Sequence, residues 1–278
     1  MSLSDHRGSW FVVKLGGELV VPGKLAGVAE GIAAFLEAGI KVAIVHGGGP
    51  QATALTRRLG LEPRQIAGRR ITDASVLQVM KQALAGEVNV DLTALLRAEG
   101  LQRVVGLHGV SAGLVEAVRR PPRLIKGGPA EPVDLGFVGD VVHVNTSLLE
   151  TLAADGYVPA IASLSGSADG NVLNINADTV ATRIAVELGA AKLLLVAGVP
   201  GILLDLHDPT SRVPRITPAE AEELIGKGVI GGGMIPKVQD ALAGVAAGIG
   251  AVHICGADRG QLLIEASDPG SSGTVFVQ

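Results

Sequence analysis

Two lysines and one aspartate stand at positions that packing alone does not explain. Lys14 interrupts the apolar run 10–15, where an unpaired ammonium group would be expensive to bury. Lys237 falls in the first turn of a predicted helix, where a cation is unfavourable by about 0.3 to 1 kcal/mol. Asp178 ends the segment 172–178, in which polar and apolar residues alternate. Two cations held by one carboxylate would stabilise the charge on a migrating phosphoryl group, so this set predicts phosphoryl transfer.

Glycine-rich loops would supply the backbone donors of such a site. The run 42–50 (Val-Ala-Ile-Val-His-Gly-Gly-Gly-Pro) predicts a buried strand that ends in three glycines, with a helix behind it at 51–59. The bare N–H groups and the positive end of the helix favour an anion. Glycines also follow the first strand at 16–17 and precede the Lys237 helix at 231–233. Each loop could also be only a tight turn between elements.

Further polar side chains are candidates for holding a ligand. In the extended segment 68–73 (Gly-Arg-Arg-Ile-Thr-Asp), neighbouring side chains point to opposite faces, so one arginine can face a ligand while the other is solvated. Both arginines could also lie at the surface. Asn174, Asn176 and Asp178 project to one side of the predicted strand, although Asp178 could be only the N-cap of a helix that begins at Thr179.

The elements around these residues predict an α/β fold. A strand at 10–15, a helix at 25–37 and the strand at 42–46 form a β-α-β unit, so their glycine loops should lie at one edge of a parallel sheet, where ligands bind. The runs 114–118 and 137–144 predict a β-hairpin with a flap over the site. Other strands and helices are predicted as follows: strands at 103–106, 157–163, 192–196, 251–255 and 274–277, and helices at 75–84, 89–99, 145–154, 218–226, 234–248 and 259–266.

Composition limits the classes of protein. With 278 residues and 47% hydrophobic content, the chain can form one large domain of two closely packed lobes, about 1–165 and 166–278, that share a sheet. A net charge of -4 and 2% aromatic residues argue against nucleic-acid binding. No apolar run reaches the roughly 20 residues that span a bilayer, and no signal peptide is evident. A single cysteine cannot form an internal disulfide, so we expect a cytoplasmic protein without membrane contact.

Six segments together resemble, in order and over nearly the whole chain, the N-acetylglutamate kinases of the amino-acid kinase superfamily. The resemblance implies a three-layer αβα sandwich around a mainly parallel central sheet. It implies ATP-dependent phosphorylation of the γ-carboxylate of N-acetyl-L-glutamate, an early step of arginine biosynthesis, with the acceptor in the N-terminal lobe and MgATP in the C-terminal lobe. Mg²⁺ would be held mainly by the nucleotide phosphates, with no protein metal ligands. The segments are 14–17 (Lys-Leu-Gly-Gly), 46–50 (His-Gly-Gly-Gly-Pro), 68–72, 134–140, 174–178 (Asn-Ile-Asn-Ala-Asp) and 233–237 (Gly-Met-Ile-Pro-Lys).

The resemblance also implies roles for individual residues. Lys14 and Lys237 would stabilise the transition state, and Asp178 would organise them. Arg70 would form charged hydrogen bonds with the acceptor's α-carboxylate. A carboxylate acceptor is already ionised and needs no general base, so His46 is expected only to order its loop. The acceptor-binding residues would be Gly48, Gly49, Arg70, Asn174 and Asn176. The nucleotide-binding residues would be Gly16, Gly17, Gly198, Val199, Gly201, Ile202, Leu203, Val229, Ile230 and Gly231.

The sequence departs from the family pattern at a few positions. Gly198 stands where relatives often have Asp, Val90 replaces a frequent lysine, and Ser111 with Ala112 replaces a Lys-Asp pair. None of these positions belongs to the proposed chemical centre. Arginine-inhibited relatives carry a long N-terminal helix that links dimers into hexamers. Because only nine residues precede Trp10, we expect a homodimer that is insensitive to arginine.

Three alternatives remain beside this interpretation. Gly47, Gly49 and Ala52 fit the G-x-G-x-x-A pattern of a dinucleotide-dependent oxidoreductase. That pattern lacks an acidic residue at the end of the next strand, and it leaves the two lysines unexplained. A non-catalytic sensor would keep the fold without turnover. A sibling kinase would phosphorylate another carboxylate, such as a carrier-linked aminoadipate.

Overall fold

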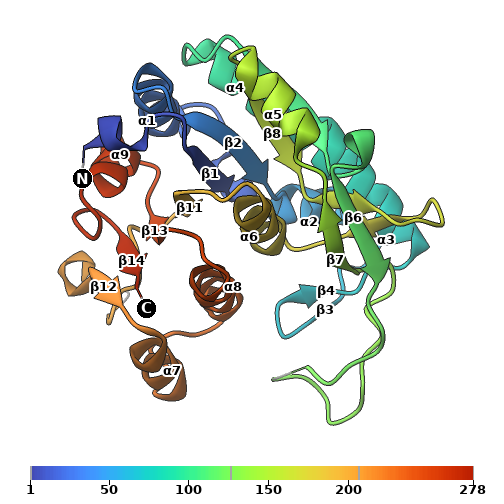
Figure 1. Ribbon diagram of the computed structural model, residues 1–278. Helices are drawn as coiled ribbons and strands as arrows, with labels where there is room; N and C mark the ends of the chain where they lie inside the picture. The colour runs from blue at the N-terminus through green and yellow to red at the C-terminus, as the bar shows by residue number, and fades with distance from the viewer. Residues whose placement is uncertain (1, 126, 206, 278) are drawn as a thin grey trace.

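The computed structural model describes residues 2–125, 127–205 and 207–277 as one α/β sandwich (Figure 1). The central sheet has eight strands in the order β12-β14-β13-β11-β1-β2-β8-β5. Neighbouring strands are parallel except for β13 and β14, so the predicted mainly parallel sheet is confirmed. The strands are β1 (Trp10–Leu15), β2 (Lys41–His46), β5 (Val104–His108), β8 (Val158–Ala162), β11 (Lys192–Val196), β12 (Arg215–Ile216), β13 (Val252–Cys255) and β14 (Thr274–Phe276).

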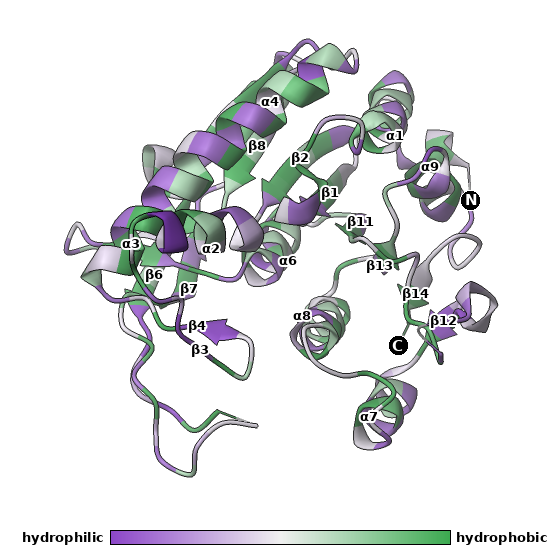
Figure 2. Ribbon diagram, turned by 180° about the vertical axis from the view of Figure 1, so that it is seen from behind, coloured by the Kyte–Doolittle hydropathy of each residue, from purple (hydrophilic) through white to green (hydrophobic). Residues whose placement is uncertain are grey.

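Helices cover both faces of this sheet and bury two separate cores. One core contains side chains of α1, α4 and α9, and the other contains side chains of α5, α6 and α8. Figure 2 shows apolar and hydrophilic residues alternating along α1 and α4, as expected for helices with one face on a sheet. The helices are α1 (Ala26–Glu37), α2 (Gly49–Arg58), α3 (Ala74–Met80), α4 (Asn89–Ala98), α5 (Ser147–Ala154), α6 (Ala177–Glu187), α7 (Pro218–Gly226), α8 (Met234–Ala246) and α9 (Gln261–Ser267).

The central strand β1 shows how the sheet positions Lys14. Its side chains alternate between the two cores: Trp10 and Val12 face the core of α6 and α8, whereas Phe11 and Val13 face the core of α1 and α9. Lys14 therefore lies on the α6 and α8 face, at the carboxyl end of a strand that pairs with β2 and β11. The predicted β-α-β unit is confirmed, because β1 and β2 are parallel and α1 joins them.

A second sheet stands beside the first and forms the predicted hairpin. Its order is β10-β9-β6-β7, and the antiparallel pair β6 and β7 joins through a long loop that extends past β3 and β4 (Figure 1). This loop is fastened to the chain that follows β4, since the Thr72 N–H donates to the Leu135 carbonyl at 2.9 Å and Phe137 N–H donates to the Thr72 carbonyl at 2.7 Å. The strands are β3 (Gln65–Ile66), β4 (Arg69–Arg70), β6 (Val115–Arg119), β7 (Gly139–Val144), β9 (Leu164–Gly166) and β10 (Val172–Asn174).

The helices predicted at 75–84 and 89–99 are instead one continuous helical run. A π-helical segment, Lys81–Val88, joins α3 to α4 without a break. A glycine inside a helix costs only about 1 kcal/mol, and here Gly86 lies between buried Leu84 and Val88. Burial of the Leu84 and Val88 side chains outweighs the tendency of Gly86 to interrupt the helix.

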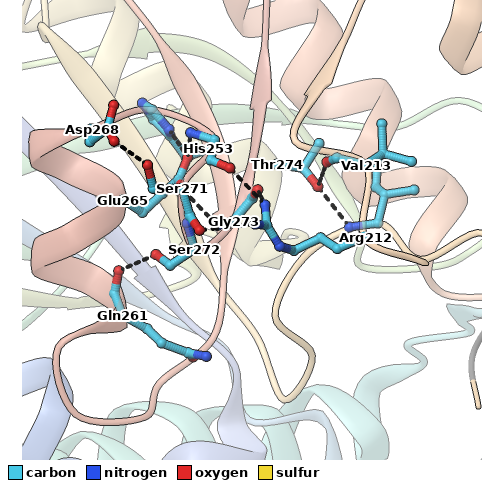
Figure 3. Close-up of polar contacts among 12 residues, drawn as sticks. Arg212, Val213, His253, Gln261, Glu265, Asp268, Ser271, Ser272, Gly273 and Thr274 are labelled. Carbon is cyan, nitrogen blue, oxygen red and sulfur yellow. Dashed lines mark hydrogen bonds and ion pairs between the residues drawn. The ribbon is translucent and has the colours of Figure 1, made fainter. Parts of the chain in front are cut away.

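A buried carboxylate holds the C-terminal end of the fold together (Figure 3). Glu265 on α9 is fully buried and accepts hydrogen bonds from the backbone N–H groups of Gly270 at 2.8 Å, Ser272 at 3.1 Å and Gly273 at 2.6 Å. His253 Nδ1 on β13 lies 2.8 Å from the same carboxylate. Burial raises the pKa of Glu265, but these hydrogen bonds outweigh burial and hold the pKa below its ordinary value. The ionised side chain thus fixes the loop that leads into β14.

Within the described ranges, no helix combines the length and the apolar character needed to cross a bilayer.

Candidate active site

Lys14, Asp178 and Lys237 come together from three elements. Lys14 Nζ on β1 lies 2.9 Å from Asp178 Oδ1 on α6. Lys237 Nζ on α8 lies 3.1 Å from the same oxygen and 3.3 Å from Oδ2. The three side chains are 9%, 10% and 12% exposed for Lys14, Asp178 and Lys237 respectively. The two ammonium groups therefore converge on one carboxylate, as the sequence predicted.

The electrostatics of this cluster follow from burial and from the shared carboxylate. Burial raises the pKa of Asp178, but the charges and hydrogen bonds of Lys14 and Lys237 outweigh burial and lower it below its ordinary value. Burial and the charge of Lys14 lower the pKa of Lys237, and Asp178 offsets only part of that effect. The cluster contains one anion between two cations and is suited to attract a further anion.

The local structure around Asp178 differs from the predicted strand. β10 ends at Asn174, so the alternating segment does not continue as a strand to 178. Asn176, not Asp178, is the N-cap of α6, because its side-chain oxygen accepts the Asp178 backbone N–H at 3.0 Å. Asp178 lies in the first turn of α6, where the helix dipole favours a carboxylate. The helix thus has its N-cap two residues before Asp178, and Asp178 belongs to the helix instead of the end of the strand.

A cavity of about 600 Å³ opens beside the cluster at the carboxyl ends of β1 and β2. Gly16, Gly17, Gly48 and Gly49 line it, together with Lys14 and with Asn174 of β10. The two glycine loops pack backbone against backbone, since a Cβ on Gly17 would lie 2.7 Å from the Gly48 Cα. A side chain at position 17 would therefore push the two loops apart, whereas one at position 48 would press on Val88 and Leu84. Without side chains, the backbone groups of these glycines are free to face a ligand. The remaining predicted acceptor-binding residues that line this cavity are Arg70, Asn174 and Asn176.

A buried polar network orders the first glycine loop. Burial lowers the pKa of His46 to about 4, so its ring is neutral. Asn89 Nδ2 lies 2.8 Å from His46 Nε2 and donates to the Ala160 carbonyl at 2.9 Å, which makes Nε2 an acceptor and leaves the proton on Nδ1. Nδ1 then donates to the Gly47 carbonyl at 2.9 Å. This geometry agrees with the expected ordering role of His46. Asn89 was missed because a helix-spaced pattern does not mark which polar residue is buried.

Gln51 ties the same loop to the loop after β1. Its Nε2 donates to the Gly17 carbonyl at 2.7 Å, so the start of α2 and the first glycine pair are joined directly. Its Oε1 is buried and has no hydrogen-bond partner within the described part of the chain. The sequence places Gln51 directly after Pro50, and that position alone does not indicate a contact with residue 17.

Arginines surround the acceptor side of the cavity. Arg70 Nη2 donates to Thr53 Oγ1 at 2.7 Å and to the Gly49 carbonyl at 3.2 Å, whereas its buried Nη1 has no partner among the described residues. Arg69 also lines the cavity, and both arginines are half-buried, so the structure does not divide them into one that faces the cavity and one that is solvated. Arg120 and Arg123, from the loop between β6 and β7, line it as well and were not predicted.

The predicted nucleotide-binding residues do not all share this cavity. Gly16 and Gly17 line it, whereas Gly198 and Val199 line a second cavity of about 680 Å³. Gly201, Ile202, Leu203 and Ile230 are buried, and the Ile202 N–H donates to Thr274 Oγ1 at 2.9 Å. Val229 is half-buried and Gly231 is exposed beside Gly232 and Gly233, which line the first cavity.

A second carboxylate in the cavity, Asp240, was not predicted. It lies one helical turn after Lys237 on α8, and Thr179 Oγ1 donates to its two oxygens at 3.3 and 3.2 Å. Burial, followed by the charge of Asp178, raises the pKa of Asp240 to about 6. The sequence did contain one sign of this placement: Asp240 lies three residues after Lys237, and residues three apart share a helix face.

Comparison with known proteins gives the family. A model of the amino acid kinase family matches residues 9–256. The chain is 52% identical to an acetylglutamate kinase of Sorangium cellulosum over 96% of this chain and 94% of that protein, and 51% identical to one from an Anaeromyxobacter species over 96% and 98%. A crystal structure from Streptococcus mutans superimposes with a TM-score of 0.77 at 32% identity, over 96% of this chain and 98% of the other. The chain therefore belongs to the amino acid kinase family.

Proposed function

We propose that this chain transfers the γ-phosphoryl group of ATP to the γ-carboxylate of N-acetyl-L-glutamate, an early step of arginine biosynthesis. The observation that carries the proposal is the convergence of Lys14 and Lys237 on Asp178 at the edge of a glycine-lined cavity. The choice of acceptor is supported by relatives named acetylglutamate kinase, whose sequences are 51% and 52% identical to this chain.

The chemistry needs few protein groups. An oxygen of the acceptor carboxylate attacks the γ-phosphorus, the bond from that phosphorus to the bridging oxygen breaks, and ADP leaves with the electron pair. No proton has to be removed from an ionised carboxylate, so no general base is required. Lys14 and Lys237 would stabilise the charge on the migrating group, and Asp178 would keep the two ammonium groups aimed at it.

The two substrates would occupy opposite sides of the cluster. The unpartnered Nη1 of Arg70 suits the acceptor's α-carboxylate, with Gly48, Gly49, Asn174 and Asn176 around the rest of the molecule. Gly16, Gly17 and Gly231 would hold the phosphates. The other predicted nucleotide residues, Gly198, Val199, Gly201, Ile202, Leu203, Val229 and Ile230, would lie along the adenosine. In this arrangement residues 1–165 supply most of the acceptor contacts and residues 166–278 most of the ATP contacts, while Asn174, Asn176, Gly16 and Gly17 cross that division.

A divalent cation, Mg²⁺, would accompany the nucleotide and neutralise part of the phosphate charge. No group of three or more His, Cys, Asp or Glu side chains that could form a metal cage occurs among the residues the structure describes. A cavity without such a cage suits an ion whose main ligands are phosphate oxygens and water.

A coupled assay of ADP release tests the acceptor. We expect turnover with N-acetyl-L-glutamate and at least about a hundredfold lower kcat/KM with glutamate, aspartate, carbamate or UMP, because polar and charged groups of a built site reject ligands that leave them unpaired. The Lys237→Ala variant, purified in the same way, measures contaminating kinase activity. Turnover with another acceptor but not with acetylglutamate would contradict the proposal, and no ADP with any acceptor would favour a non-catalytic sensor.

We also propose a homodimer. β5 lies at one end of the eight-stranded sheet, and Val90 on the adjoining α4 is 61% exposed. An open parallel edge and an exposed apolar side chain next to it suit a second copy of the chain. Light scattering should give about twice the chain mass of 28.1 kDa. A monomer or a hexamer would contradict this assembly.

A further inference from the structure

Asp240 is a carboxylate in the cavity that the proposed chemistry does not use. It lines the cavity next to Asp178 and Thr179, and its hydrogen bonds come from the neutral Thr179 hydroxyl. In the described chain both ammonium groups of the cluster pair with Asp178 and neither pairs with Asp240. Asp240 is therefore a half-buried carboxylate without a direct cationic partner in the described chain.

The charged groups that face Asp240 come from three elements. Asp178 on α6 repels its ionised form, whereas Lys237 on α8 and Lys14 on β1 favour that form. With Asp240 ionised, the four side chains carry two positive and two negative charges. With Asp240 protonated, the same set has one net positive charge. The protonation state of this one group thus decides whether the cluster can attract a polyanion.

Nucleotide binding must act on this balance. Phosphates that enter beside Gly16, Gly17 and the cluster bring negative charge into the cavity that Asp240 lines. A nearby like charge disfavours ionisation of a carboxylate. The pKa of Asp240, already raised to about 6 by burial and then by Asp178, must rise further when phosphates bind.

We propose that Asp240 takes up a proton when a magnesium nucleotide binds, so that this chain couples nucleotide binding to proton uptake through one side chain of the site. The inference rests on the proposed function only in that nucleotide phosphates enter this cavity. Its sign is fixed: the protonated form binds phosphates more tightly. Affinity must therefore fall as the pH rises above the pKa of the free group, and the loss must stop once the pH passes the pKa of the complex.

Isothermal titration calorimetry with MgATP, and without an acceptor, tests the proposal. Titrations at about pH 7 in buffers of different ionisation enthalpy give the number of protons exchanged on binding. The phosphates of MgATP stay ionised in this range, so the uptake reports protein groups. We expect an uptake that approaches one proton in the unmodified chain, and a dissociation constant that rises by up to about tenfold per pH unit above pH 6, since one pKa unit corresponds to one decade.

Asp240→Asn keeps the shape of the side chain and removes its titration. In this variant we expect the uptake to fall below about a fifth of that in the unmodified chain and the pH dependence of affinity to flatten to less than about twofold per unit. The matched control is Asp155→Asn, at an exposed position at the end of α5, which should behave like the unmodified chain. An uptake that is the same in Asp240→Asn as in the unmodified chain would overturn the inference and point to Lys237, whose pKa is also displaced.

A second variant keeps the test decisive if Asp240→Asn does not fold. Thr179→Val removes the hydroxyl whose hydrogen bond stabilises ionised Asp240, so the pKa of Asp240 rises and the loss of affinity should begin at a higher pH. An unchanged pH profile in this variant would contradict the inference. Acetylglutamate-dependent ADP release with no proton uptake would overturn the inference alone, whereas failure to bind MgATP would overturn the proposed function as well.

Discussion

Replacing Lys237 by alanine should lower kcat by about a hundredfold to a thousandfold and change the KM for ATP much less. The reason is that Lys237 shares the Asp178 carboxylate with Lys14 and would act on charge that moves during phosphoryl transfer. Removal of one preorganised group that stabilises such charge typically costs a factor of this size in kcat. Steady-state kinetics with both substrates saturated in turn separates the two parameters.

The control for this variant is Lys227→Ala. Lys227 lies at the exposed end of α7 and pairs with Glu223 at the surface, so its loss should leave kcat unchanged. If Lys237→Ala kept the full rate, the assignment of that lysine to the transition state would be wrong. A large rise in KM with an unchanged kcat would assign it to ground-state binding instead.

Replacing Asp178 by asparagine should impair both stability and turnover. The change leaves two largely buried ammonium groups without their shared anion, and breaking a buried ion pair from one side costs about 3 to 5 kcal/mol. The free energy of unfolding, measured in urea, should therefore fall by about 3 kcal/mol. We expect kcat to fall by about a hundredfold or more, because the two cations would no longer be held in position.

Asp155→Asn is the surface control for this experiment and should stay within about 0.5 kcal/mol of the unmodified chain. If the Asp178→Asn variant were as stable as the unmodified chain but inactive, the carboxylate would position the lysines without contributing to the stability of the fold. A variant that is as active as the unmodified chain would remove Asp178 from the site.

The centre of the site was predictable because its residues violate local rules. A lysine in a fully apolar strand and a lysine in the first turn of a helix are each costly, so a partner for them could be expected before any fold was known. The two strands that frame the site were equally clear: β1 has the predicted bounds, and β2 begins one residue earlier than predicted. The dinucleotide alternative loses its support, since it gave no role to the lysines and the chain belongs to a kinase family.

What could not be predicted depends on contacts between distant segments. The link from Asn89 to His46 and the link from Gln51 to residue 17 join parts of the chain whose local patterns contain no sign of each other. Asp240 looks like any polar residue on an amphipathic helix until α6 packs against α8. The helical cap at Asn176 was missed because an alternating pattern and a capping residue use the same polar side chains.

Because Asp178 is shared by two lysines from distant parts of the chain, the order of synthesis decides when the site is complete. Lys14 leaves the ribosome first, Asp178 much later, and Lys237 last of the three, because they lie in this order along the chain. A nascent chain that has not yet released α8 has one ammonium group on Asp178 instead of two. ATP present during translation therefore meets an incomplete centre until α8 has emerged, and a product that terminates before α8 lacks one of the two cations.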